Sequence, residues 1–101
     1  MSLTVNLWSR KNGDLKRFLE SYFDREMDIN ENTMDWSYCY RKPLEAVDII
    51  SAAMDNCDKY QIYICIMFNG DQLHIVTPEN HNEVIRDIFQ LFYHETAINY
   101  N

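Results

Sequence analysis

Glycine is scarce in this chain of 101 residues, and its two glycines, Gly13 and Gly70, lie far apart. Loops that hold phosphates or a dinucleotide need several neighbouring glycines, because the backbone has to approach the ligand without a Cβ in the way. Such a loop cannot be built here. We therefore expect no nucleotide cofactor, and no other motif in the sequence indicates a cofactor.

The chain also has few cysteines and histidines, three of each. Cys39, Cys57 and Cys65 form no Cys-x-x-Cys pair, and their odd number argues against a disulfide framework. We expect free thiols in a reducing, cytoplasmic compartment. The histidines lack the spacing of a helical zinc motif, and no Gly-x-Ser-x-Gly turn occurs. Local motifs therefore predict no catalytic residue and no metal site.

Basic residues are outnumbered, with 9 Lys and Arg against 16 Asp and Glu, which gives a net charge of −7. Nucleic acids and anionic lipid surfaces are bound mainly by basic side chains, so neither is an expected partner. No run approaches the roughly 20 apolar residues of a membrane-spanning helix, and the N-terminus lacks the pattern of a secretory signal. The expected partners are proteins.

Apolar and aromatic residues, by contrast, are plentiful at 47% and 14% of the chain. That content can offset the conformational entropy lost on folding, and the length suits one core, so residues 1–101 are predicted to form a single domain. Period-two alternation or continuous apolar runs predict strands at 3–9, 34–40, 60–68 and 71–77. One-sided apolar spacing predicts three helices: one capped by Asn12 or Asp14, one that starts at Pro43, and one capped by Asn80 or Asn82.

This order, β-α-β-α-β-β-α, predicts an α+β fold, a two-layer α/β sandwich. Helices connect the first three strands, which favours parallel pairing there, and the Asn69-Gly70 dipeptide favours an antiparallel hairpin at the end. We therefore expect a mixed four-stranded sheet. Because each helix is apolar on one side only, the helices should lie mainly on one face of the sheet and leave the other face open.

Strand alternation predicts which side chains occupy that open face. If the isoleucines of 62–68 face the helices together with Leu73 and Ile75, the other side collects Trp8, Cys39, Tyr63, Cys65, Met67 and His74. Three helices cannot cover both faces, and exposed apolar patches mark interfaces. The leading interpretation is a non-enzymatic interaction or regulatory module that forms a homodimer or binds a protein partner through Trp8, Tyr63 and Met67.

Two alternatives remain open. Cys39, Cys65 and His74 could converge as soft metal ligands, or as a thiol beside a base, in a small metal- or thiol-dependent enzyme. Against this, a closed zinc site needs four ligands, and each residue alone is explained by burial or hydrogen bonding. The second alternative is an acidic inhibitor or immunity-type protein that binds a basic partner through Asp24, Glu26, Asp28 and Glu31.

Two further patterns are weaker. Asp24, Glu26, Asp28 and Asn30 alternate like the first ligands of an EF-hand, but Ile29 stands where that loop needs glycine, so a solvated loop is the better interpretation. Alternating Trp36, Tyr38 and Tyr40 could form a platform for a ligand. A core-facing strand is the ordinary explanation of such a pattern.

Overall fold

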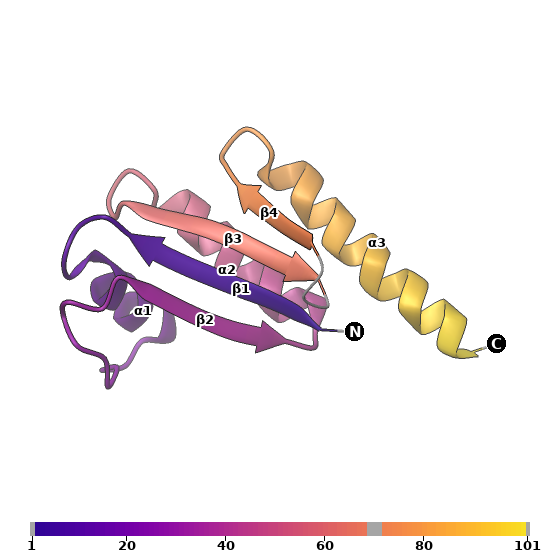
Figure 1. The fold of residues 1–101 in the computed structure, drawn as a ribbon, viewed down its shortest axis with the longest axis horizontal. Coiled ribbons are helices and arrows are strands. Elements are labelled where there is room, and N and C mark those ends of the chain that lie inside the picture. Colours follow the sequence, from indigo (N-terminus) through magenta and orange to yellow (C-terminus); the bar gives the residue numbers. More distant parts are fainter. Residues whose placement is uncertain (1, 69–71, 101) are drawn as a thin grey trace.

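In the computed structural model, which describes residues 2–68 and 72–100, the chain forms the seven elements that the sequence predicts, in the predicted order (Figure 1). The α+β class is thereby confirmed. The Asn69-Gly70 turn lies outside the described residues. The elements are β1 (Leu3–Ser9), α1 (Asp14–Phe23), β2 (Asp35–Tyr40), α2 (Pro43–Asp55), β3 (Ile62–Phe68), β4 (Gln72–Val76) and α3 (His81–Tyr100).

The core lies between one face of the sheet and the helices. Alternate residues of β1 and β3 are buried there, and the helices add residues at i, i+3 and i+4 spacing. Each fully buried Leu or Ile side chain contributes roughly 1.5–3 kcal/mol relative to exposure, so this layer supplies most of the folding energy. Its fully buried members include Leu3, Val5, Leu7, Leu15, Leu19, Ile49, Ile50, Ile64 and Ile88.

The sheet has the order β2-β1-β3-β4, and every neighbouring pair is antiparallel. The predicted mixed sheet is therefore wrong. After α1, the loop 24–34 brings the chain back to the end of β1, where the Ser9 N–H donates to the Met34 carbonyl (3.0 Å) and the Gly13 N–H to that of Glu31 (2.9 Å). Because of this return, β2 starts beside the end of β1 and runs in the opposite direction.

The connection from β2 through α2 to β3 joins two strands that run parallel, as expected, but these strands are not neighbours in the sheet. β2 and β3 are both antiparallel to β1, so they run parallel to one another with β1 between them. The helix α2 spans this gap behind the sheet (Figure 1). Pro43 occupies its first turn, as predicted, since proline needs no backbone donor there.

The helices lie on one side of the sheet, as expected. α1 and α2 cover the face that carries the buried residues of β1 and β3, and α3 packs against α2 beyond the β4 edge (Figure 1). Within residues 2–68 and 72–100, no helix combines the length and apolar character needed to cross a membrane. In the part of the chain that the structure describes, no helix covers the opposite face of the sheet.

The start of α1 departs from the sequence-based expectation. Gly13, with a φ of 86°, precedes the helix, and no side chain caps it, so the predicted capping by Asn12 or Asp14 is wrong. Asp14 instead lies in the first turn, where its carboxylate accepts hydrogen bonds from Arg17 Nη2 (2.7 Å) and the backbone N–H of Gln61 (3.2 Å). This buried carboxylate ties the start of α1 to the chain just before β3.

Candidate functional site

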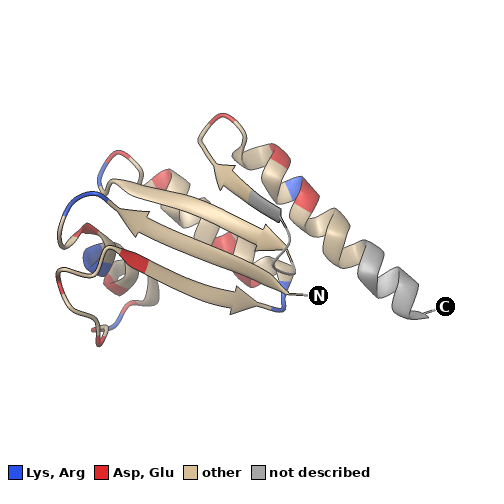
Figure 2. Cartoon of the chain, viewed as in Figure 1, with Lys and Arg blue, Asp and Glu red and all other residues tan. Residues whose placement is uncertain are grey.

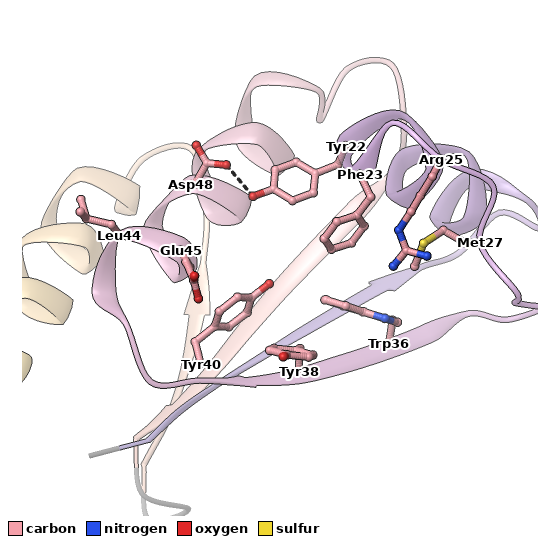
Figure 3. Close-up of a pocket in the computed structure, with 10 residues that line it drawn as sticks. All are labelled: Tyr22, Phe23, Arg25, Met27, Trp36, Tyr38, Tyr40, Leu44, Glu45 and Asp48. Carbon is pink, nitrogen blue, oxygen red and sulfur yellow. Dashed lines mark hydrogen bonds between the residues drawn. The ribbon is translucent and has the colours of Figure 1, made fainter.

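A wide groove opens on the helix side of the sheet, beside the edge strand β2. It has a volume of about 950 Å³ and lies between β2, the end of α1 and the first half of α2 (Figure 3). We call it the aromatic groove, defined by its lining residues Tyr22, Phe23, Arg25, Met27, Trp36, Tyr38, Tyr40, Leu44, Glu45 and Asp48.

The floor of the aromatic groove comes from the alternation of β2. Trp36, Tyr38 and Tyr40 pair with Leu7, Val5 and Leu3, so their side chains share the helix-facing side of the sheet. The helices are centred on the inner strands, and the edge strand is only partly covered. Tyr40 is buried, whereas Tyr38 is 55% exposed. The core-facing interpretation thus holds for Tyr40 and in part for Trp36, which is partly buried against the core, whereas Tyr38 is accessible.

The rings of this floor form a continuous row. Trp36 and Tyr38 stack with centroids 6.1 Å apart and an angle of 12° between their planes, and Tyr38 lies 4.8 Å from Tyr40. Phe23, from α1, adds a tilted ring 6.2 Å from Trp36. The exposed ring of Tyr38 within this row suits flat or cationic groups, which aromatic faces bind through dispersion and their ring quadrupole.

Two carboxylates from α2 stand over the Tyr40 end of the groove (Figure 3). Glu45 and Asp48 are three residues apart and therefore share one side of the helix. The Tyr22 hydroxyl donates a hydrogen bond to Asp48 Oδ2 (2.5 Å). Burial, followed by the negative charges around it, raises the pKa of Tyr40 to about 12, and Glu45 and Asp48 are among those charges.

Tyr22 responds to the same charges. Burial, its hydrogen bond to Asp48 and the nearby carboxylates raise the pKa of Tyr22 well above its usual value. A tyrosine is neutral near pH 7 even at its ordinary pKa, and the raised pKa values make both phenols still less suited to act as a base or a nucleophile there. Burial is the largest cause of both shifts, and the carboxylates of Glu45 and Asp48, which contribute to both, make this end of the groove acidic.

The opposite end of the groove carries a positive charge. The Arg25 guanidinium lies 5.6 Å from the centre of the Phe23 ring, at the Trp36 end (Figure 3). The basic pair Arg41 and Lys42 follows Tyr40 directly in the chain and lines a second hollow with residues of α3 that include Phe89 and Tyr93. The two ends of the aromatic groove therefore differ in charge. The end beside α2 is acidic, and the end beside Arg25 is basic.

The structure does not bring Cys39, Cys65 and His74 together. Cys39 and Cys65 share the open face as predicted, but β1 lies between their strands, which separates them by roughly 9–10 Å across the sheet. His74 pairs with Ile66 and lies on the helix side, 5.8 Å from the Phe68 ring. The predicted position of His74 is wrong, because the register of the hairpin, which local alternation does not set, decides its face.

The same register also shows that the predicted face of Ile75 is wrong. Ile75 pairs with Cys65 and is 62% exposed on the open face, although it was expected to face the helices. The side chain of Leu73 lies outside the described residues. Within the part of the chain that the structure describes, no three His, Cys, Asp or Glu side chains are grouped so that they could hold a metal ion. The acidic residues Asp24, Glu26, Asp28 and Glu31 are exposed along their loop.

The predicted interface residues do lie on the open face. Trp8 and Tyr63 stack with centroids 4.4 Å apart, and the Arg10 guanidinium lies over both rings at 5.8 and 5.2 Å. Tyr63 is 36% exposed and Met67 is partly buried. Towards β2 the face becomes polar, where Asn6 Nδ2 donates to the Asp35 carboxylate and to Ser37 Oγ (2.7 Å). The open face is thus apolar over β3 and β4 and polar over β2.

Sequence reasoning identified the aromatic row but missed the residues that complete the groove. Tyr22, Glu45 and Asp48 come from two helices whose positions over β2 depend on the strand order. The only signal for them was the pair of acidic residues three positions apart beside the apolar stripe of α2. Comparisons of the chain with protein-family models, with curated proteins and with solved structures give no match.

Proposed function

We propose that the protein is a non-enzymatic, cytosolic interaction module that self-associates through the open face of its sheet. One observation carries this proposal: among the described residues no helix covers this face, and its apolar half remains partly exposed to water. The residues proposed for the contact are the stacked pair Trp8 and Tyr63 near one end of the face, Met67 near the other end, and Ile75 between them on β4. A second copy of the chain is the simplest cover for such a face, through a two-fold interface.

The size of the face supports a modest affinity. Four strands with up to seven residues each span roughly 19 by 23 Å, or about 450 Å² in projection. Stable complexes bury about 800 Å² of accessible surface on each partner, and only part of this face is apolar. We therefore expect association at tens of micromolar rather than at nanomolar concentrations.

Several features support binding over catalysis. Burial, followed by the charges around them, raises the pKa of Tyr22 and Tyr40, so these two phenols ionise less readily than an ordinary tyrosine. Cys39 and Cys65 stand on separate strands of one face, while His74 lies on the other. A thiol therefore has no imidazole beside it in this trio, and the arrangement that a thiol-dependent enzyme would need is missing from it.

Self-association through the open face is tested by sedimentation velocity between 5 and about 200 micromolar protein. This range follows from the affinity expected for an interface of this size. The wild type is expected to shift from monomer to dimer. Tyr63→Glu should remain monomeric while folded, because it places a charge among the apolar side chains of this face. Tyr93→Glu is the matched control, since Tyr93 is 79% exposed on α3, away from this face.

Ile75→Lys provides a second variant that spares the core, because Ile75 is largely exposed. It should also reduce dimerisation. A wild type that stays monomeric at the highest concentration would contradict self-association. Dimerisation that is unchanged in both Tyr63→Glu and Ile75→Lys would place the interface elsewhere.

A further inference from the structure

β2 is an edge strand whose outer side is available for pairing. In the described chain it pairs with β1 on one side and has no neighbouring strand on the other. Alternate N–H and C=O groups of an edge strand point outward and can accept another strand, and proteins commonly block such edges with lysine or proline. β2 reads DWSYCY and contains neither. Asp35, at its start, is its one charged residue (Figure 2).

The aromatic groove lies directly beside this edge, on the helix side. A strand that paired with β2 would send alternate side chains towards the groove and the others towards the open face. The row from Trp36 to Tyr40 extends for about 13 Å, since four residue steps of a strand measure roughly 3.3 Å each. An added segment of five to seven residues would therefore present two or three side chains to the groove.

The charges of the groove indicate what those side chains are. At the Tyr40 end, the carboxylates of Glu45 and Asp48 stand over the floor, and Tyr38 offers an exposed ring beside them. Cations bind aromatic faces and are attracted by carboxylates, so arginine or lysine fits this end. Arg25 makes the Trp36 end unsuitable for a second cation. The net charge of −7 favours the approach of a basic segment.

We propose that β2 and the aromatic groove bind an extended, basic segment of a partner protein by strand addition, with an arginine or lysine side chain between Tyr38, Glu45 and Asp48. Backbone hydrogen bonds to β2 hold the segment, and the groove selects its side chains. The site is on the opposite side of the sheet from the proposed dimer face. Failure of one proposal therefore leaves the other intact.

The probe is a seven-residue threonine peptide with a single arginine at its centre, so that one cation faces the groove, titrated into the ¹⁵N-labelled full chain. Amide resonances of β2 and the indole resonance of Trp36 are expected to shift, while the Trp8 indole stays in place. The same peptide with glutamate in place of arginine tests the charge requirement. A version with N-methylated backbone amides keeps the arginine but cannot form a strand ladder, so it tests strand addition.

Two double variants and two substitutions of Tyr38 test which residues of the groove contribute to binding. Glu45→Gln combined with Asp48→Asn removes both carboxylates of the groove and is expected to weaken binding about tenfold or more. Glu26→Gln combined with Asp28→Asn is the matched control, because it removes the same two charges from the exposed loop and should change binding less than about twofold. Tyr38→Ala should weaken binding and Tyr38→Phe should preserve it, since the ring supplies the contact.

Each outcome decides the proposal. Equal binding of the glutamate peptide, or equal loss in the two double variants, would show that recognition is not centred on the groove carboxylates and would overturn it. Equal binding of the N-methylated peptide, or of N-acetylarginine amide alone, would exclude strand addition. Because Tyr38 is largely exposed, Tyr38→Ala is expected to fold, so the test does not depend on the double variant at Asp48, whose hydrogen bond to Tyr22 also supports the fold.

Discussion

Replacing Asp14 by Asn changes a single buried charge while keeping the size and shape of the side chain. The Asp14 carboxylate accepts hydrogen bonds from Arg17 Nη2 at 2.7 Å and from the Gln61 backbone N–H at 3.2 Å. Hydrogen bonds to a charged group contribute about 1.5–3 kcal/mol, and a carboxylate in the first turn of a helix gains roughly 0.3–1 kcal/mol from the helix dipole. The amide keeps one acceptor oxygen, so we expect Asp14→Asn to lower the free energy of unfolding by about 1.5–3 kcal/mol near pH 7.

The pH dependence of that loss follows from the pKa of Asp14. Burial acts to raise the pKa, but the hydrogen bonds from Arg17 and Gln61 and the charges of Lys11 and Arg17 outweigh it, so the pKa is lowered in the folded state. The unfolded chain therefore takes up the proton first as the pH falls. The stabilisation by the carboxylate is complete above the unfolded pKa near 3.8 and disappears as the pH drops through the lower folded value.

Urea unfolding of the wild type and Asp14→Asn between pH 7 and pH 2.5 measures this effect as a difference. The difference in unfolding free energy is expected to be constant from pH 7 to about pH 5 and to shrink below pH 4. Asp28→Asn serves as the control, since Asp28 is exposed in the loop and should change stability by less than about 0.5 kcal/mol. A difference between wild type and Asp14→Asn that is absent at pH 7, or that does not change down to pH 2.5, would refute the account of this carboxylate.

Two further predictions concern the core and the thiols. Ile64 is fully buried in β3, so Ile64→Ala is expected to cost roughly 2–5 kcal/mol, whereas Asp28→Ala should cost less than about 0.5 kcal/mol; comparable losses in urea unfolding would mean that the acidic loop is a structured site. All three cysteines are free, with Cys39 exposed and Cys57 and Cys65 partly buried, so a thiol reagent should modify Cys39 first and reach all three after unfolding without reductant. Fewer than three reactive thiols in the unfolded, unreduced chain would contradict this.

Much of the fold follows from local patterns in the sequence. Alternation in β1 placed Leu3, Val5 and Leu7 on the helix side and Trp8 on the open face, because side chains of a strand alternate whatever its neighbours are. One-sided helices likewise required a single covered face. These features depend on a few consecutive residues and could therefore be predicted without knowledge of the strand order.

The strand order and the register depend on interactions between distant segments. The loop 24–34 returns to the end of β1 and makes β2 antiparallel, a result that no local pattern in Asp24 to Met34 indicates. The register of the final hairpin decided that His74 faces the helices and Ile75 the open face. For the same reason the aromatic groove could be predicted only as a row of aromatic residues, without the carboxylates of Glu45 and Asp48.

The two tryptophans allow the central claim, binding through two opposite surfaces of one sheet, to be measured in a single experiment. Trp8 lies on the open face and Trp36 in the aromatic groove, so their two indole N–H resonances report on one surface each. On dilution of the protein, the Trp8 resonance is expected to move while that of Trp36 stays in place. On addition of the arginine peptide, the Trp36 resonance is expected to move and that of Trp8 to stay. A shift of the Trp36 resonance on dilution would contradict the account. So would two experiments in which neither indole resonance shifts.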